Sequence, residues 1–270
     1  MILVNGVPQD TISAGDRGLA YGDGVFRTLA TRAGTALCWP RHFAKLAEDC
    51  RRIGITPPVE PVLLGEVEQV ARGRAQGAVK IIVTRGHGER GYALPANPQA
   101  TRIVMGMPMP AWPAENSTEG IRARICDLRL AEQPRLAGIK HLNRLENVLA
   151  RAEWNDPVIA EGLLLDRHGN LIEGVTSNVF IVLNGVLVTP DLSACGVAGV
   201  TRERILAWAR TAGTACEIRR VTCDELWNAE EILACNSLIG VWRVREIGGR
   251  CCGNGGWTSR IRQFLAESHD

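Results

Sequence analysis

The chain has 270 residues, of which 46% are hydrophobic and 22% charged, and its formal net charge is +2. This composition is ordinary for a globular protein with a substantial core, and the lack of a dense basic stripe argues against nucleic-acid binding. The nine cysteines are an odd number and show no CxxC or Cys/His ligand spacing, so we expect reduced thiols, no metal site and a cytoplasmic location. No stretch is long and apolar enough to span a membrane.

The N-terminal part of the chain predicts a mixture of strands and helix. The segment "RHFAKLAEDCRRIG" (41–54) places its apolar residues on one helical face, and "VKIIVTRG" (79–86) and "RIVMGMPM" (102–109) predict strands. The following "PMPAWPAENSTEG" (108–120) is rich in proline and has no periodicity, which is typical of a linker. We therefore expect an N-terminal α+β domain over residues 1–110, an interdomain linker over 111–119 and a C-terminal domain over 120–270.

The C-terminal part predicts strands followed by a helix. Apolar and polar residues alternate in "IRARICDLRL" (121–130), as they do in a half-buried strand. The long run "LIEGVTSNVFIVLNGVLVTP" (171–190) predicts successive strands, because Asn184-Gly185 is a strong signal for a tight hairpin turn. The segment "GVTRERILAWARTAG" (199–213) predicts a helix with Thr201 as its N-cap. The expected whole is a mainly antiparallel α+β chain in two parts.

Lysine is scarce in this chain, since it occurs only at positions 45, 80 and 140. The segment "LAGIKHLNRLE" (136–146) predicts that Lys140 lies in the first turn of a helix, where the helix dipole opposes its charge by about 0.3–1 kcal/mol. Lys140 either reaches into solvent at small cost, or its surroundings favour the neutral amine, which can attack a carbonyl. The second alternative indicates a Schiff base, often with pyridoxal phosphate.

Pyridoxal phosphate requires a carboxylate at its ring nitrogen and hydrogen-bond donors around its phosphate. Glu173 ends a predicted strand and is followed by the polar residues of "GVTSN". Thr201 lies where a glycine-containing turn enters a helix, so the amides of that first turn can face an anion. Glu173 could instead be a simple turn carboxylate and Thr201 a simple cap, but both occur in the order that a cofactor site requires.

Four segments carry a family resemblance. "YGDGVFRT" (21–28), "GIKHLN" (138–143), "EGVTSNVF" (173–180) and "GVTRE" (199–203) resemble the signatures of fold-type IV pyridoxal-phosphate enzymes. That family contains branched-chain and D-amino-acid aminotransferases as well as a lyase. The resemblance implies a two-domain α+β fold with a smaller N-terminal α+β domain and a larger C-terminal domain with a barrel-like sheet. It also implies pyridoxal 5'-phosphate as the cofactor and a homodimer.

The segments "GIKHLNRLENV", "RGHGERGY" and "CNSLIGV" resemble the lyase branch of that family. This resemblance implies conversion of 4-amino-4-deoxychorismate to 4-aminobenzoate and pyruvate, a step of folate biosynthesis, with Lys140 forming the Schiff base and moving the proton. The sequence departs from the family pattern at Lys45, which stands where an arginine usually binds the phosphate. The cofactor-binding residues that the resemblance implies are Lys45, Lys140, Asn143, Glu173, Ser177, Asn178, Val200, Thr201 and Ser237.

The resemblance also implies residues that act on the substrate. Thr28 is expected to protonate or orient the leaving enolpyruvyl group, so it joins Lys140 as a catalytic candidate; it could instead be a β-branched strand residue facing a core. The two substrate carboxylates need cations, and Asn236 could be either a substrate ligand or an ordinary turn residue. The substrate-binding candidates are Arg27, Arg85, Arg90, Tyr92 and Asn236.

Two rival functions share part of this pattern. A D-amino-acid or branched-chain aminotransferase of the same fold would use Lys140, Glu173 and Thr201 but would transfer the amino group to a keto acid. A non-catalytic carrier of pyridoxal phosphate would need the lysine and the phosphate site but not Thr28, Arg90 and Asn236. The assay of amino-group exchange separates the first rival from the lyase.

Overall fold

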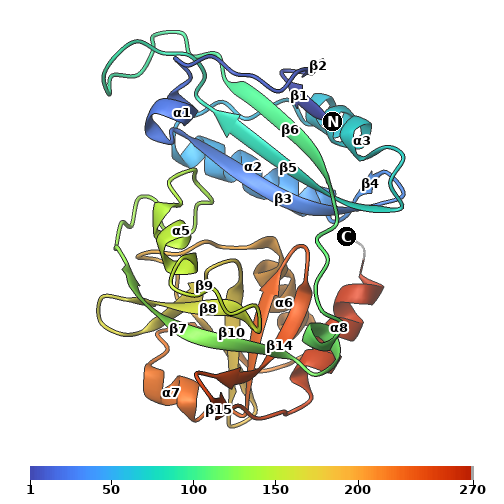
Figure 1. The fold of residues 1–270 in the computed structure, drawn as a ribbon, viewed down its shortest axis with the longest axis vertical. Helices are drawn as coiled ribbons and strands as arrows, with labels where there is room; N and C mark the ends of the chain where they lie inside the picture. The colour runs from blue at the N-terminus through green and yellow to red at the C-terminus, as the bar shows by residue number, and fades with distance from the viewer. Residues whose placement is uncertain (269–270) are drawn as a thin grey trace. The chain divides into compact units, whose positions relative to one another are not determined.

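Two separate β-sheets organise the chain, one in each of two structural units (Figure 1). The computed structural model describes residues 1–268. Among the described residues, the first unit contains Met1–Pro110 together with Lys140–Asn143, and the second contains Ala111–Ile139 and residues 144–268. The segment expected as a linker begins the second unit and includes a short helix, α4 (Glu115–Thr118).

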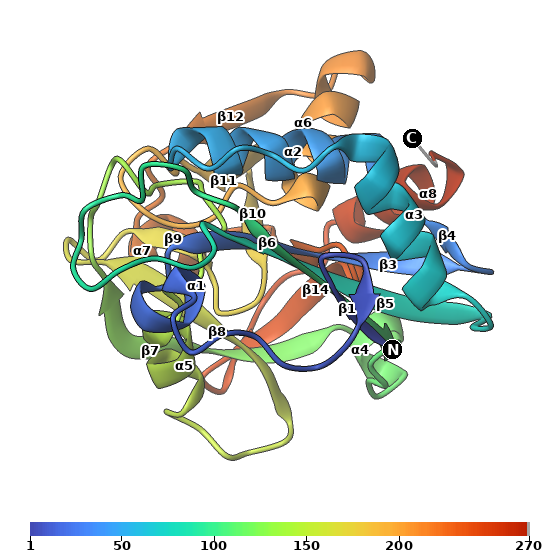
Figure 2. The same ribbon diagram turned by 90° about the horizontal axis from the view of Figure 1, so that it is seen from above.

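The first unit is built on a six-stranded sheet in the order β2-β1-β6-β5-β3-β4, and every neighbouring pair is antiparallel. Two helices, α2 and α3, cover one face of this sheet (Figures 1 and 2). The elements are β1 (Ile2–Val4), β2 (Val7–Pro8), α1 (Arg17–Tyr21), β3 (Gly24–Arg32), β4 (Thr35–Ala36), α2 (Trp39–Arg52), α3 (Glu60–Ala71), β5 (Gln76–Thr84) and β6 (Thr101–Pro108).

Helix α2 packs on β3 through the apolar face that the sequence predicts. Leu46, Ala47 and Cys50 are buried at helical spacing, and the chain leaves the helix at Gly54, whose φ is +71°. Side chains alternate along β3, so Arg27 shares the α2-covered face with its buried neighbours, while Thr28 lies on the opposite face and is half-buried. Thr28 therefore does not point into the core beneath α2.

The second unit is a nine-stranded sheet in the order β12-β11-β10-β13-β14-β7-β8-β9, with β15 paired to β14. A bridge between Leu171 in β9 and Val221, just after β12, joins the two ends of this order, so the sheet is barrel-like. Its strands are β7 (Ile121–Leu130), β8 (Ile159–Asp166), β9 (Leu171–Gly174), β10 (Asn178–Leu183), β11 (Val186–Pro190), β12 (Cys216–Arg219), β13 (Glu231–Asn236), β14 (Gly240–Ile247) and β15 (Arg250–Cys251), and its helices after α4 are α5 (Leu145–Arg151), α6 (Val200–Thr211), α7 (Cys223–Trp227) and α8 (Trp257–Glu267).

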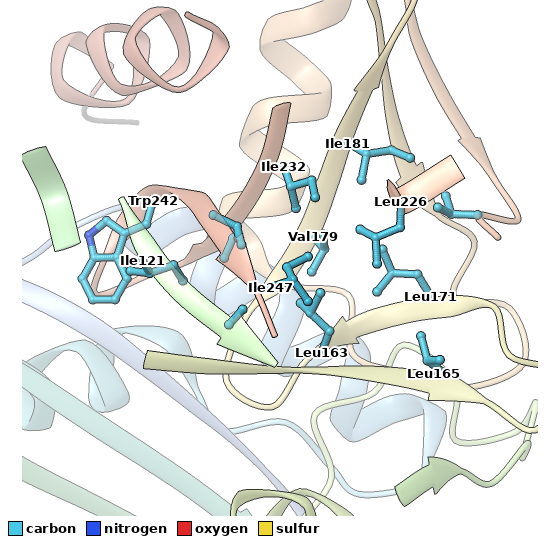
Figure 3. Close-up of a cluster of buried hydrophobic side chains, with 14 of the residues drawn as sticks. Ile121, Leu163, Leu165, Leu171, Val179, Ile181, Leu226, Ile232, Trp242 and Ile247 are labelled. Atoms are coloured by element: carbon cyan, nitrogen blue, oxygen red, sulfur yellow. The ribbon is translucent and has the colours of Figure 1, made fainter. Parts of the chain in front are cut away.

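Apolar side chains fill the inside of this sheet (Figure 3). Alternate residues of β10, such as Val179 and Ile181, point into this cluster, whereas Phe180 and Val182 pack in a second cluster with α6 and α8. A strand covered on both faces reads as a continuous apolar run, which explains the sequence "VFIVL". The predicted hairpin at Asn184-Gly185 is confirmed, since β10 and β11 pair on either side of it and both turn residues have positive φ.

The prediction that Lys140 opens a helix is wrong. Helix α5 begins only at Leu145, and Lys140 lies in an extended segment along the edge of β3. The amide of Phe26 donates to the carbonyl of Lys140 (2.9 Å), and the amide of Leu142 donates to the carbonyl of Gly24 (3.0 Å). These bonds to a distant strand replace the local helical bonds that the leucine spacing suggested. Lys140 therefore does not lie at a helix N-terminus, and no helix dipole opposes its charge there.

The predicted helix after residue 199 is present, but its cap is different. Gly199 is the N-cap of α6, and Thr201 lies inside the first turn rather than before it. The expectation that Thr201 caps the helix is therefore wrong, because the chain remains extended only as far as Gly199. Among residues 1–268 no helix is long and apolar enough to cross a membrane.

Candidate active site

Lys140 is half-buried, and its ammonium lies 4.6 Å from the centre of the Phe26 ring. Its backbone is held on both sides: its carbonyl accepts from Phe26, and its amide donates to Oδ2 of Asp49 (3.2 Å). Gly24, which receives the next bond of this ladder, has no room for a side chain. An added Cβ there would come within 2.6 Å of the Val83 carbonyl, so a glycine is required where the segment lies against β3.

Thr28 and Lys80 lie beside this lysine on the sheet. They are directly opposite each other on β3 and β5, so both side chains emerge on the sheet face that α2 does not cover. The ammonium of Lys80 lies 5.1 Å from the centre of the Phe26 ring. Lys140 and Lys80 thus lie within cation–π distance of one aromatic ring. Lys80 is not among the residues predicted from the sequence to form the site, although the scarcity of lysine in this chain was a signal.

Arg27 and Arg85, both predicted to bind substrate carboxylates, are buried with carboxylates of the protein itself. Arg27 forms an ion pair with Asp49 on the helix-covered face. Arg85 binds both oxygens of Asp23, at 2.7 and 3.0 Å. Burial alone would raise the pKa of Asp23, but hydrogen bonds from Arg85 and Arg17 hold it below its usual value. Arg27 is therefore paired within the first unit, and Arg85 shares Asp23 with Arg17 while its other donors bond to the carbonyls of Gly54 and Ile53.

Arg90 and Tyr92 lie in the exposed loop between β5 and β6, where Tyr92 is 86% exposed. Helix α1 holds this loop from one side. The guanidinium of Arg17 donates to the carbonyl of Gly91 (3.0 Å), the amide of Gly91 donates to the hydroxyl of Tyr21 (3.1 Å), and the rings of Tyr21 and Tyr92 are 5.4 Å apart. The loop backbone around Arg90 is thus fixed while its two predicted substrate residues remain at the surface.

Lys45 and Asn143, both predicted to bind the cofactor, make local contacts in the first unit. The ammonium of Lys45 forms an ion pair with Glu48 one helical turn away (2.8 Å), and this contact lowers the pKa of Glu48. The side-chain amide of Asn143 donates to the carbonyl of Gly22 (3.3 Å), which connects the Lys140 segment to the turn before β3.

Glu173 lies buried at the end of β9, as its predicted role requires. Its Oε2 accepts a hydrogen bond from the amide of Val197 (2.8 Å). Asn178 supports the same segment, because its side-chain amide donates to the carbonyl of Val197 (2.7 Å) and its Oδ1 accepts from the backbone amide of Gly199 (3.0 Å). The side chains of Glu173 and Asn178, both in the motif "EGVTSN", therefore fix the chain that enters α6.

The N-terminus of α6 is suited to an anion. Its N-cap Gly199 supplies no side-chain oxygen, so the first-turn amides, including those of Val200 and Thr201, receive no side-chain cap. A side chain at Gly199 would collide with Oδ1 of Asn178, so only glycine allows this close approach. The hydroxyl-bearing side chain of Thr201 is buried in the same turn.

Ser177 and Asn236 belong to two turns that are tied together. The buried carboxylate of Glu161 accepts hydrogen bonds from the hydroxyls of Thr176 and Ser177, both at 2.8 Å. The side chain of Asn236 donates to the carbonyl of Thr176 (3.1 Å) and accepts from the amide of Leu238 (2.9 Å). The side chain of Asn236 thus connects the two turns, and Ser237 lies half-buried beside it.

Comparison with known proteins identifies the family. Residues 24–247 match the family model described as amino-transferase class IV. The chain belongs to this family. It is 48% identical to a crystal structure of 4-amino-4-deoxychorismate lyase from Pseudomonas aeruginosa, which covers 99% of both chains with a TM-score of 0.95. It is 33% identical to an aminodeoxychorismate lyase of Vibrio harveyi over 92% of this chain and 91% of that one, and 29% identical to a D-alanine aminotransferase of Bacillus licheniformis over 89% and 84%.

Class IV enzymes depend on pyridoxal phosphate, so this protein is a pyridoxal-phosphate-dependent enzyme with the two-domain α+β fold that the resemblance implied. The residues present fit the cofactor. Taken by itself, the first unit holds a scarce lysine with a fixed backbone, whose amine would suit the cofactor's aldehyde. The second unit holds the buried carboxylate of Glu173, which would suit a protonated ring nitrogen. The uncapped N-terminus of α6 matches a phosphate.

Proposed function

We propose that this class IV enzyme is a lyase that converts 4-amino-4-deoxychorismate to 4-aminobenzoate and pyruvate, and thereby serves folate biosynthesis. The observation that carries this proposal is the 48% identity with the Pseudomonas aeruginosa lyase along 99% of both chains. The pairing of a hydroxyl, Thr28, with a second lysine, Lys80, on the face beside the Phe26 ring supports it.

When bound, pyridoxal phosphate supplies an aldehyde that condenses with amines and a protonated ring that accepts an electron pair. Lys140 would hold the cofactor through its amine, and the same amine would remove the proton from the substrate carbon that bears nitrogen. Glu173, fixed by the amide of Val197, keeps the ring nitrogen protonated. In the second unit the first-turn amides of α6, with Thr201 and Ser237, would hold the phosphate. Lys45 of the first unit is proposed as a cation for it.

Thr28 acts at the neighbouring carbon, where the bond to the enolpyruvyl oxygen breaks. Its hydroxyl orients or protonates that oxygen, and the enol that leaves becomes pyruvate by taking up a proton on carbon. Loss of the proton and of the ether makes the ring aromatic, which supplies the driving force. Since Arg27 and Arg85 are already paired with Asp49 and Asp23, we assign the substrate carboxylates to Lys80 and Arg90.

The second candidate is an aminotransferase of the same fold, which the 29% identity with a D-alanine aminotransferase of Bacillus licheniformis favours. Both candidates use Lys140 and Glu173. The test is to purify the protein with its cofactor and to assay 4-aminobenzoate release from aminodeoxychorismate beside amino-group exchange between an amino acid and a keto acid. A yellow protein that exchanges amino groups but releases no 4-aminobenzoate contradicts the lyase assignment.

We also propose a homodimer in the cytoplasm. Helix α5 exposes an apolar stripe at spacings of three and four residues: Leu145 is 68% exposed, Val148 61% and Leu149 54%. Such a stripe is typical of a surface covered by a second subunit. None of the nine cysteines, which all lie within residues 1–268, forms a disulfide, which is consistent with a reducing compartment. Light scattering of the wild type against L145E/L149E tests the dimer, because the charged variant should shift the mass toward one subunit.

A further inference from the structure

Asp49 is a charged residue on the buried face of α2, and its exposed fraction is 0%. A buried carboxylate is unfavourable unless other groups satisfy it. Its Oδ2 accepts from the guanidinium of Arg27, which is 2% exposed, and from the backbone amide of Lys140 at 3.2 Å. The proposed chemistry uses neither Asp49 nor Arg27, so this pair needs a separate explanation.

The bond to Lys140 occurs where strand pairing would otherwise continue. His141 forms a bridge with Val25, and the flanking bonds run from Phe26 to Lys140 and from Leu142 to Gly24. In this antiparallel register the amide of Lys140 is the next group that would face β3. It donates to the helix residue Asp49, so the Lys140 peptide is held by β3 through its carbonyl and by α2 through its amide.

We propose that Asp49 is a positioning residue for Lys140. Its carboxylate, neutralised by Arg27, fixes the peptide plane of Lys140 and hence the direction in which the lysine side chain leaves the backbone. A proton-transfer group must lie within hydrogen-bond reach of the proton that it takes, and a displacement of about 1 Å costs about 10²-fold in rate. This inference rests on the proposed role of Lys140.

A merely structural ion pair is the competing explanation, and the first unit contains a matched control. Glu66 in α3 is buried and forms an ion pair with Arg102 in β6 (2.6 Å). That pair also joins a helix to the sheet, but it joins α3 to β6 rather than α2 to the Lys140 segment. The double variant E66L/R102M therefore reports what loss of a buried ion pair does by itself.

The decisive comparison uses two variants that differ only in the acceptor at position 49. R27M/D49N removes both charges but keeps a side-chain oxygen for the amide of Lys140, whereas R27M/D49L removes the acceptor as well. Asparagine has nearly the volume of aspartate, whereas leucine is larger, and the smaller methionine at position 27 offsets part of that difference. Deuterium exchange at the Lys140 amide is measured in cofactor-free protein, and kcat and KM for 4-aminobenzoate release are measured with the cofactor.

We expect the leucine variant to exchange the Lys140 amide at least tenfold faster than the asparagine variant and to lose about 10- to 100-fold in kcat, with KM little changed. The asparagine variant and E66L/R102M should keep kcat within about threefold of the wild type. Equal exchange and equal kcat in the two position-49 variants would overturn the inference, as would an equal loss in the control.

A measurement on the wild type decides the matter if the leucine variant does not fold. In cofactor-free protein the Lys140 amide should be protected although it lies outside any regular helix or strand, and exchange at the rate of an unstructured peptide overturns the proposal. Failure of the proposed function gives a different result: borohydride reduction of the loaded wild type would then leave Lys140 unmodified, whatever its amide exchange.

Discussion

Thr28 and Lys80 are cross-strand neighbours on β3 and β5, and they share the sheet face that α2 leaves uncovered. Directly opposite residues in an antiparallel pair have Cβ atoms about 4.5–5.5 Å apart. A hydroxyl and an ammonium at this separation can act on one small substrate, the first at a leaving oxygen and the second at a carboxylate. Two predictions follow from the pair, one for each side chain.

Replacing Thr28 by valine removes the hydroxyl and keeps the shape. We expect T28V to lower kcat by about 10²-fold, since a positioned proton-transfer group contributes about 10²–10⁴-fold, with KM nearly unchanged. Steady-state assay of 4-aminobenzoate release checks this. T31V is the matched control, because Thr31 lies buried on the opposite face of the same strand. A T28V enzyme as fast as T31V would remove Thr28 from the mechanism.

Replacing Lys80 by methionine removes the charge and keeps most of the side chain. A charge-assisted hydrogen bond contributes about 1.5–3 kcal/mol, so we expect K80M to raise KM by at least about tenfold. K80R keeps the positive charge and should recover part of the affinity. Substrate titration of the three proteins checks the order wild type, K80R, K80M. An unchanged KM in K80M would show that other cations bind the carboxylates.

Replacing Gly199 by alanine should weaken cofactor binding. The new methyl group would collide with Oδ1 of Asn178 and push the first turn of α6 away from its position. We expect the Kd for pyridoxal phosphate, measured by titration of the cofactor-free protein, to rise about tenfold, because a displaced helix N-terminus loses amide bonds to phosphate. G65A is the control, since an added Cβ at Gly65 meets nothing within 4 Å. Equal affinities in the two variants would contradict the phosphate assignment.

The ion cluster at Asp23 predicts a dependence of stability on pH. Hydrogen bonds from Arg85 and Arg17 lower its pKa in the folded state below the usual 3.8, although burial opposes them. The unfolded state therefore binds the proton first. The stabilisation is complete above about pH 4 and is lost as the pH falls through the lower folded-state pKa. Urea unfolding between pH 6 and pH 2.5 should show this loss in the wild type, and D23N should be less stable at pH 6 and lose less on acidification.

The parts of the fold that depend on local sequence were predictable. The hairpin at Asn184-Gly185 needs only two residues with positive φ between apolar runs, and both features are visible in the sequence. The apolar face of α2 follows from helical spacing in the same way. The order of Lys140, Glu173 and the α6 N-terminus along the chain also indicated the family and its cofactor.

The parts that depend on distant pairing were not predictable. Leu142 and Leu145 have helical spacing, yet the amide of Leu142 bonds to the carbonyl of Gly24, more than a hundred residues away. The leucine spacing alone does not show that pairing with a distant strand competes with the local helix. Lys80 became a candidate only when the register of β5 against β3 placed it opposite Thr28. Arg27 and Arg85 form ion pairs with Asp49 of α2 and with Asp23 in the turn before β3. Because these partners are distant in sequence, the sequence could not exclude the two arginines as substrate ligands.

The most direct test of the central assignment uses the scarcity of lysine. Only Lys45, Lys80 and Lys140 carry a side-chain amine that can form an imine with the cofactor. Borohydride reduction of the cofactor-loaded protein, followed by peptide mass mapping, shows which of the three was linked to it. We predict one reduced adduct, at Lys140, and its loss in K140A. An adduct at Lys80 or Lys45 with Lys140 unmodified would contradict it.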